Sequence, residues 1–145
     1  MNGFFKIIAI KCNGEKILTE SYLLNNNFAE GRIEWKRENG NIFLIENYKN
    51  GKLHGEYKYF NKKNILEMEF NFYEGIKRGP FKLYYEDGKI KQQGYFEDDL
   101  TLNGIYKSYY SNGKIEIVGY YDKGKKIGKW MYFDIKGKII KIENF

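Results

Sequence analysis

The sequence predicts an all-β fold: an elongated single-layer antiparallel meander of about six tandem β-hairpin repeats, with no helical layer. A turn glycine or asparagine is followed eight residues later by an aromatic ring six times, at a period of about 24 residues. Aromatic residues make up 19% of the chain, and 16 glycines accompany a single proline, which suits strands joined by tight turns. No segment has the apolar period of a helix. The six pairs are Gly14/Tyr22, Gly40/Tyr48, Asn64/Phe72, Gly88/Phe96, Gly113/Tyr121 and Gly137/Phe145.

The repeats occupy almost the whole chain and leave little room for a catalytic domain. Successive turn positions lie 26, 24, 24, 25 and 24 residues apart. We therefore expect one repeat domain over residues 1–145 that begins with a degenerate hairpin at 1–30. The apolar run from Phe4 to Ile10 is interpreted as a strand rather than an export signal, because Lys6 interrupts it. The hairpin repeats that follow are expected at 31–54, 55–78, 79–103, 104–127 and 128–145.

Each hairpin is expected to close with a two-residue turn. The turn pairs are Asn13-Gly14, Asn39-Gly40, Asp87-Gly88, Asn112-Gly113 and Lys136-Gly137, and Asn64 takes the place of glycine in the remaining unit. Asn-Gly and Asp-Gly favour the type I′ turn, in which both central residues have positive φ. The implied cross-strand pairs are Tyr85/Ile90, Leu83/Gln92, Phe81/Gly94, Tyr110/Ile115, Ser108/Ile117 and Tyr106/Gly119. Two of these place an aromatic ring across from glycine, a pairing known to stabilise sheets.

Side-chain alternation then predicts two different faces. One, the ring face, carries Tyr57, Phe81, Tyr106 and Trp130, and this register adds Leu66, Ile90, Ile115 and Ile139 to it. The other, the lysine face, carries Lys58, Lys82 and Lys107, with Phe60, Tyr84, Tyr109 and Phe133 beside them. A single-layer sheet has to cover an apolar face by curling, by dimerising or by holding a partner. Because tyrosine beside lysine is typical of recognition surfaces, the candidate partner contacts are Lys58, Lys82, Tyr84, Lys107 and Tyr109.

The connectors between repeats are expected to form one basic rim, because they all emerge at the same end of the strands. The formal net charge is +6, which permits attraction to anionic surfaces. Asp98 and Asp99 interrupt the rim, and a merely solvated rim is the alternative interpretation. The candidate contacts for an anionic lipid surface are Lys49, Lys52, Lys77, Arg78, Lys123, Lys125 and Lys126.

The residues that usually carry chemistry are scarce. The one histidine, His54, has no second histidine or cysteine pair nearby, so it is interpreted as a turn residue rather than a ligand or base. The one cysteine, Cys12, cannot form an internal disulfide, and no apolar stretch approaches the length needed to cross a bilayer, so a cytoplasmic protein is expected. Catalytic residues, cofactors, metals and specific nucleic-acid binding are not expected. The spacing of the rings is explained by the strand pleat alone.

Three blocks of the sequence resemble the MORN repeat, in its bacterial variant form. They run from Tyr48 to Phe60, from Gly79 to Lys89 and from Gly104 to Lys114. Proteins built wholly of such variant repeats are commonly grouped as YwqK-like antitoxin or immunity proteins, so the resemblance implies a hairpin array that binds other molecules. Such repeats also accompany some phosphatidylinositol phosphate kinases. This sequence lacks a glycine-rich phosphate loop between a strand and a helix, so kinase activity is not expected.

The expected function is therefore a non-enzymatic protein–protein interaction module, with an antitoxin or immunity role and a toxin as partner implied by the resemblance. The alternative is a peripheral membrane adaptor that binds anionic lipid through the basic rim. A homodimer through the apolar face or the edge strands is a further expected mode of association.

Overall fold

The computed structural model describes the backbone of residues 3–10, 16–23 and 28–145, and the side chains of residues 28–145. Predictions for Cys12 and for the Asn13-Gly14 turn lie outside the described residues, as does the ring of Tyr22. No helix occurs in the described part of the chain.

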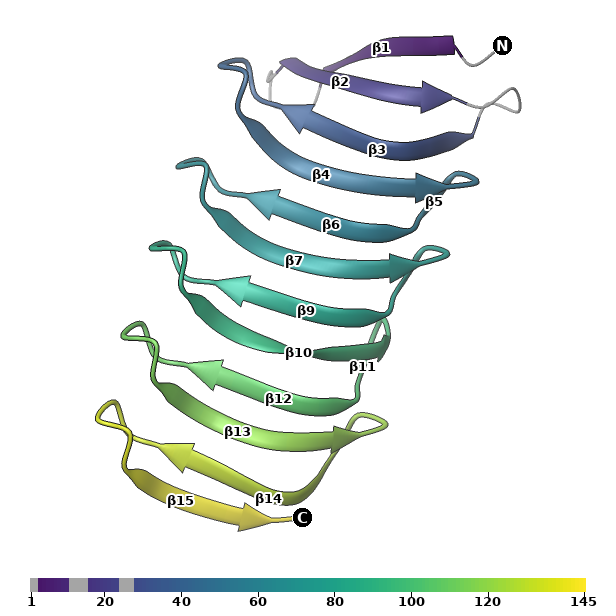
Figure 1. The fold of residues 1–145 in the computed structure, drawn as a ribbon. Helices are drawn as coiled ribbons and strands as arrows, with labels where there is room; N and C mark the ends of the chain where they lie inside the picture. The colour runs from purple at the N-terminus through teal and green to yellow at the C-terminus, as the bar shows by residue number, and fades with distance from the viewer. Residues whose placement is uncertain (1–2, 11–15, 24–27) are drawn as a thin grey trace.

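All strands belong to one antiparallel meander. The main path runs in sequence order through twelve strands, which pair as six hairpins. Figure 1 shows them stacked from β1 at one end to β15 at the other, with turns emerging alternately at two rims. The predicted single-layer hairpin array is confirmed. Its strands are β1 (Gly3–Ile10), β2 (Lys16–Leu23), β3 (Ala29–Lys36), β4 (Ile42–Lys49), β6 (Gly55–Phe60), β7 (Leu66–Tyr73), β9 (Gly79–Tyr84), β10 (Ile90–Asp98), β12 (Gly104–Tyr109), β13 (Ile115–Asp122), β14 (Lys125–Phe133) and β15 (Ile139–Asn144).

The hairpin turns are longer than predicted. In the β9–β10 hairpin, Tyr85 N donates to Lys89 O at 2.8 Å and Gly88 N donates to Tyr85 O at 2.9 Å. Among the three loop residues only Gly88 has positive φ, at 82°. This is a three-residue loop that ends in a left-handed residue, not a type I′ turn. The left-handed position is held in the same way by Gly40, Asn64, Gly113 and Gly137.

The type I′ geometry occurs instead at the other rim. Asn50-Gly51, Glu74-Gly75 and Lys123-Gly124 each have positive φ at both residues. They connect the long strands to the short strands β5 (Lys52–Leu53) and β8 (Ile76–Lys77), which lie off the main path, and to the first residues of β14. The connector from β10 into β11 (Thr101–Leu102) runs through Asp99 and Leu100, neither of which has positive φ.

The predicted register is correct away from the turns and wrong beside them. Leu83 pairs with Gln92 and Phe81 with Gly94, as expected, but Ile90 pairs with Tyr84 rather than Tyr85 because Lys91 is an extra residue in a bulge. The same shift pairs Ile115 with Tyr109 rather than Tyr110. A one-residue shift moves a side chain to the opposite face. Leu66, Ile90, Ile115 and Ile139 therefore belong to the lysine face, where they pair with Phe60, Tyr84, Tyr109 and Phe133.

The core lies on both faces: Ile45 is buried on the lysine face, and the most buried rings lie on the ring face. Phe81 and Trp130 are only 5% and 1% exposed, although no second layer covers them. Neighbouring rings supply the cover: Phe81 contacts Phe96 with ring centroids 4.8 Å apart, and Trp130 contacts Tyr121 at 5.0 Å. Contacts of this kind within one repeat and between repeats bury these two rings within a single chain.

Candidate interaction surfaces

The lysine face contains a row of residues that crosses the strands. Cross-strand pairing links Ile45 to Lys58, Lys58 to Glu69, Glu69 to Lys82, Lys82 to Gln93, Gln93 to Lys107 and Lys107 to Val118. Residues directly opposite one another share a face. The structure therefore brings all three predicted contact lysines into one line, and Tyr84 and Tyr109 lie two residues further along the same strands on that face.

Carboxylates pair with both lysines in the N-terminal half of this row. Lys82 Nζ lies 3.0 Å from Glu69 Oε1, and the Tyr84 hydroxyl donates to the same oxygen at 2.9 Å. Burial by itself raises the pKa of Glu69, but these two hydrogen bonds and the charges of Lys82 and Lys58 hold it below its usual value. Burial, and then the hydrogen bond to Glu69, raises the pKa of Tyr84 to about 12. Lys58 is paired as well, with Glu56 at 3.0 Å.

The C-terminal half of the row has a different environment. Lys107 lies between Gln93 and Val118, and within the described residues it has no ion pair. Beside it, burial raises the pKa of the Tyr109 hydroxyl. Tyr84 and Tyr109 thus occupy equivalent strand positions, but only Tyr84 is hydrogen-bonded to an acid of the row.

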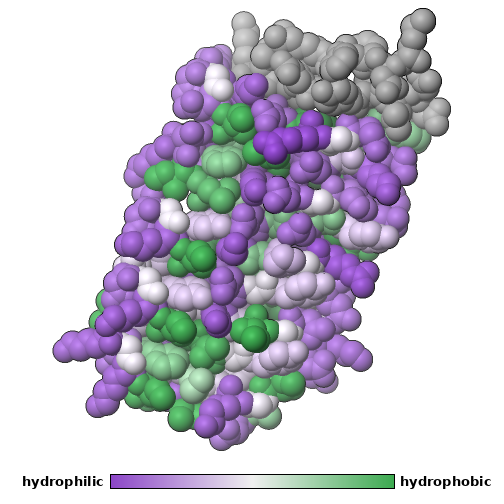
Figure 2. Space-filling model, viewed as in Figure 1, coloured by the Kyte–Doolittle hydropathy of each residue, from purple (hydrophilic) through white to green (hydrophobic). Residues whose placement is uncertain are grey.

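A second row on the lysine face was missed by sequence reasoning. Ile105 is 59% exposed and pairs with Tyr120, which is 46% exposed and pairs in turn with Ile127. Tyr95, also exposed, precedes them on β10. Strand alternation from Lys107 could have placed Ile105 on this face, since the two lie two residues apart. Figure 2 shows hydrophobic side chains gathered toward the C-terminal strands of the viewed face, with hydrophilic ones along its rims.

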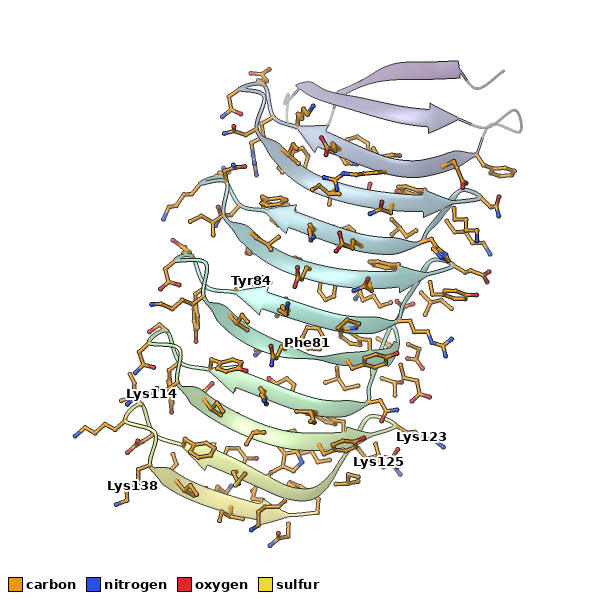
Figure 3. All side chains as sticks on the ribbon, viewed as in Figure 1. Phe81, Tyr84, Lys114, Lys123, Lys125 and Lys138 are labelled. Carbon is orange, nitrogen blue, oxygen red and sulfur yellow. The ribbon has the colours of Figure 1, made fainter. Side chains whose placement is uncertain are left out.

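The predicted basic rim is only partly assembled. Lys49, Lys52, Arg78, Lys123 and Lys125 are exposed on or beside the connectors. Figure 3 places Lys123 and Lys125 at this rim, and Lys114 and Lys138 at the opposite rim, so basic charge is not confined to one side. Among the connector residues, Leu100 is 93% exposed.

Two lysines predicted for the rim turn onto the ring face instead. Lys126 Nζ lies 4.3 Å from the centroid of the Trp130 ring, and Lys77 Nζ lies 5.3 Å from that of Phe70. Both lysines are half-buried. Lys77 and Lys126 occupy the position that Leu53 and Leu102 hold in their repeats. The aliphatic part of each lysine therefore packs where those repeats have a leucine side chain, and its ammonium lies over a ring.

His54 packs against the ring of Tyr73, with centroids 5.0 Å apart, in the connector where the sequence placed it. Within residues 28–145 no group of three or more acidic, histidine or cysteine side chains is placed to hold a metal ion. In the part of the chain that the structure describes, no helix is long and apolar enough to span a bilayer.

These features define an all-β repeat protein built from stacked hairpins. Residues 29–50, 77–98 and 102–123 match the family model of the MORN repeat variant, so the chain contains MORN repeats of this type. Such repeats are generally protein or lipid interaction modules and are typically non-catalytic. No match was found among curated proteins.

Proposed function

We propose that this chain is a non-enzymatic module that binds a protein partner through its lysine face. One observation carries the proposal: Phe81 and Trp130 on the ring face are buried by neighbouring rings, whereas Ile105 and Tyr120 stay exposed beside the lysine row. Exposed aromatic and aliphatic side chains among lysines fit a protein interface, where tyrosine supplies contact area at low entropic cost.

The test is crosslinking and affinity capture from the native cell, with matched variants on two surfaces. Ile105→Asp alters the lysine face, and Ile135→Asp alters an exposed isoleucine in the turn between β14 and β15, at the hairpin rim. A partner captured by the wild type and by Ile135→Asp, but lost with Ile105→Asp, supports the proposal. Equal capture by both variants, or loss with Ile135→Asp alone, contradicts it.

We further propose that the partner is a toxin and that the complex forms in the cytoplasm, in the manner of an antitoxin or immunity protein. The support is the resemblance to YwqK-like proteins and the net charge of +6, which suits an acidic partner. Co-expression with the toxin candidate from the neighbouring genes tests this, together with cell fractionation. Growth rescued by the wild type but not by Ile105→Asp supports the role; a lack of rescue by the wild type contradicts it.

A second candidate function is a peripheral membrane adaptor. The observation that favours it is the exposed Leu100 on the same rim as Lys123 and Lys125, because an apolar tip among lysines suits an anionic bilayer surface. It predicts vesicle binding that weakens with salt and with the double change Lys123→Glu and Lys125→Glu. Binding that is absent, or insensitive to salt, contradicts it. Lys126 is left unchanged, since it supports Trp130.

A further inference from the structure

The repeats differ in where the lysines of the lysine face find their counter-charge. In the N-terminal half, Glu69 stands between Lys58 and Lys82 and binds Lys82 at 3.0 Å. One and two repeats later, the positions that correspond to Glu69 hold Gln93 and Val118. Lys107 pairs with both of these residues. Its cross-strand neighbours are therefore the amide of Gln93 and the isopropyl group of Val118, and neither is a carboxylate.

Lys107 is also set among apolar side chains. Ile105 and Tyr109 lie two residues to either side of it on β12, on the same face. Across the strand pairs, Val118 is followed by Met131 and Ile142 in the same row. Water reaches Lys107 only in part, because its side chain is half-buried. An ammonium in such surroundings gains more from a carboxylate than a fully exposed one does.

We propose that Lys107 is the anchor for a carboxylate of the partner, an aspartate or glutamate in an extended segment with apolar residues two positions away on either side. This rests on the proposed function and names the chemistry of the partner. In an extended ligand that runs along β12, alternate side chains recur about every 6.6 Å, the spacing of Ile105, Lys107 and Tyr109. The carboxylate of the ligand then pairs with Lys107. The apolar ligand side chains on either side of it cover Ile105 and Tyr120 at one end and Tyr109 at the other.

The surroundings favour a protein segment over other anions. A phosphate of a lipid or nucleic acid could also pair with Lys107. However, Lys107 pairs with Val118 and lies between Ile105 and Tyr109 on β12. These neighbouring side chains match the aliphatic side chains of a peptide better than a polar headgroup or a base.

The test uses the full chain, immobilised, to select peptides from a random library displayed on phage. The peptides that are enriched should carry an acidic residue with apolar residues at the second position on both sides. Their synthetic forms should bind about tenfold more weakly when the acid is replaced by its amide, and about tenfold more weakly to Lys107→Met. The matched control is Lys58→Met, because Lys58 is already paired with Glu56; its binding should equal that of the wild type.

Several outcomes overturn the inference. These are no enrichment, enriched peptides without an acid at this spacing, equal binding to Lys107→Met and the wild type, or an equal loss with Lys58→Met. Phosphatidylserine vesicles or a single-stranded oligonucleotide that bind in a Lys107-dependent manner, while the acidic peptides do not, overturn it too. As a control for folding, Lys107→Met should unfold at the same temperature as the wild type, which shows that any loss of peptide binding is a local effect. A native partner that depends on Ile105 but not on Lys107 would leave the proposed function standing and remove this inference alone.

Discussion

The ring of Trp130 lies directly over the backbone of Gly119, so a β-carbon at Gly119 would overlap the indole. The predicted partner of this glycine, Tyr106, does pair with it in the β12–β13 hairpin, but the covering ring comes from the next strand, β14. At Gly94 the covering ring is that of its predicted partner, Phe81, whose Cε1 would lie 2.8 Å from a β-carbon. Ring-over-glycine contacts thus join strands both within and between repeats.

Gly119→Ala should lower the free energy of unfolding by about 1–3 kcal/mol, because the added methyl group displaces a ring that is almost fully buried. Chemical denaturation of a double-mutant cycle with Trp130→Leu checks the cause. The cost of Gly119→Ala should shrink when the indole is absent. An unchanged cost would show that backbone propensity, not the ring, restricts this position.

Two tyrosines hold successive repeats together at the hairpin rim. The Tyr85 hydroxyl donates to Tyr109 O at 2.6 Å, and the Tyr110 hydroxyl donates to Phe133 O at 2.7 Å. Tyr85→Phe and Tyr110→Phe should each cost about 1 kcal/mol of unfolding free energy, since a carbonyl loses its donor. Tyr95→Phe is the control, because Tyr95 is exposed and has no hydrogen bond from its hydroxyl within the described residues. Equal unfolding midpoints for all three variants would contradict this linkage role.

Stability should depend on Glu69 at acid pH. Its pKa is lower in the folded chain than in the unfolded one, so its contribution is present above about 4.5 and is lost as pH falls through the folded value. Urea unfolding between neutral and acid pH should therefore show a shallower loss of stability in Glu69→Gln than in the wild type. Glu67→Gln, at an exposed neighbouring position, should follow the wild-type curve. Parallel curves for Glu69→Gln and the wild type would count against the ion pair with Lys82.

Lys126 should contribute to stability although it belongs to a basic connector. Its ammonium lies 4.3 Å from the Trp130 centroid and 5.2 Å from that of Phe145. Lys126→Met keeps the stem but removes the charge, and should cost about 0.5–1 kcal/mol. Lys125→Met, one residue away and exposed, should have no measurable effect on the thermal midpoint. A midpoint shifted equally by both changes would point to general charge effects.

Much of this fold is specified by local sequence patterns, and such patterns can be recognised in the sequence alone. Turn residues at a fixed spacing, together with alternating side chains, specify a hairpin. Hairpins that follow one another in tandem then pair edge to edge with their neighbours. The positions of Phe81 across from Gly94, and of Lys58, Lys82 and Lys107 in one row, follow from counting along the strands.

Two features could not be predicted by counting residues along the strands and were decided by the tertiary structure: the position of the bulges and the burial of individual side chains. The bulge at Lys91, and its equivalents, moved Ile90, Ile115 and their counterparts to the lysine face, because one extra residue inverts every side chain between bulge and turn. Burial was decided in the same way: rings from neighbouring repeats cover Trp130, whereas Ile105 and Tyr120 have no such cover. Away from the bulges, periodicity determines which face a side chain takes, but only the packing of neighbouring repeats determines which side chains stay exposed.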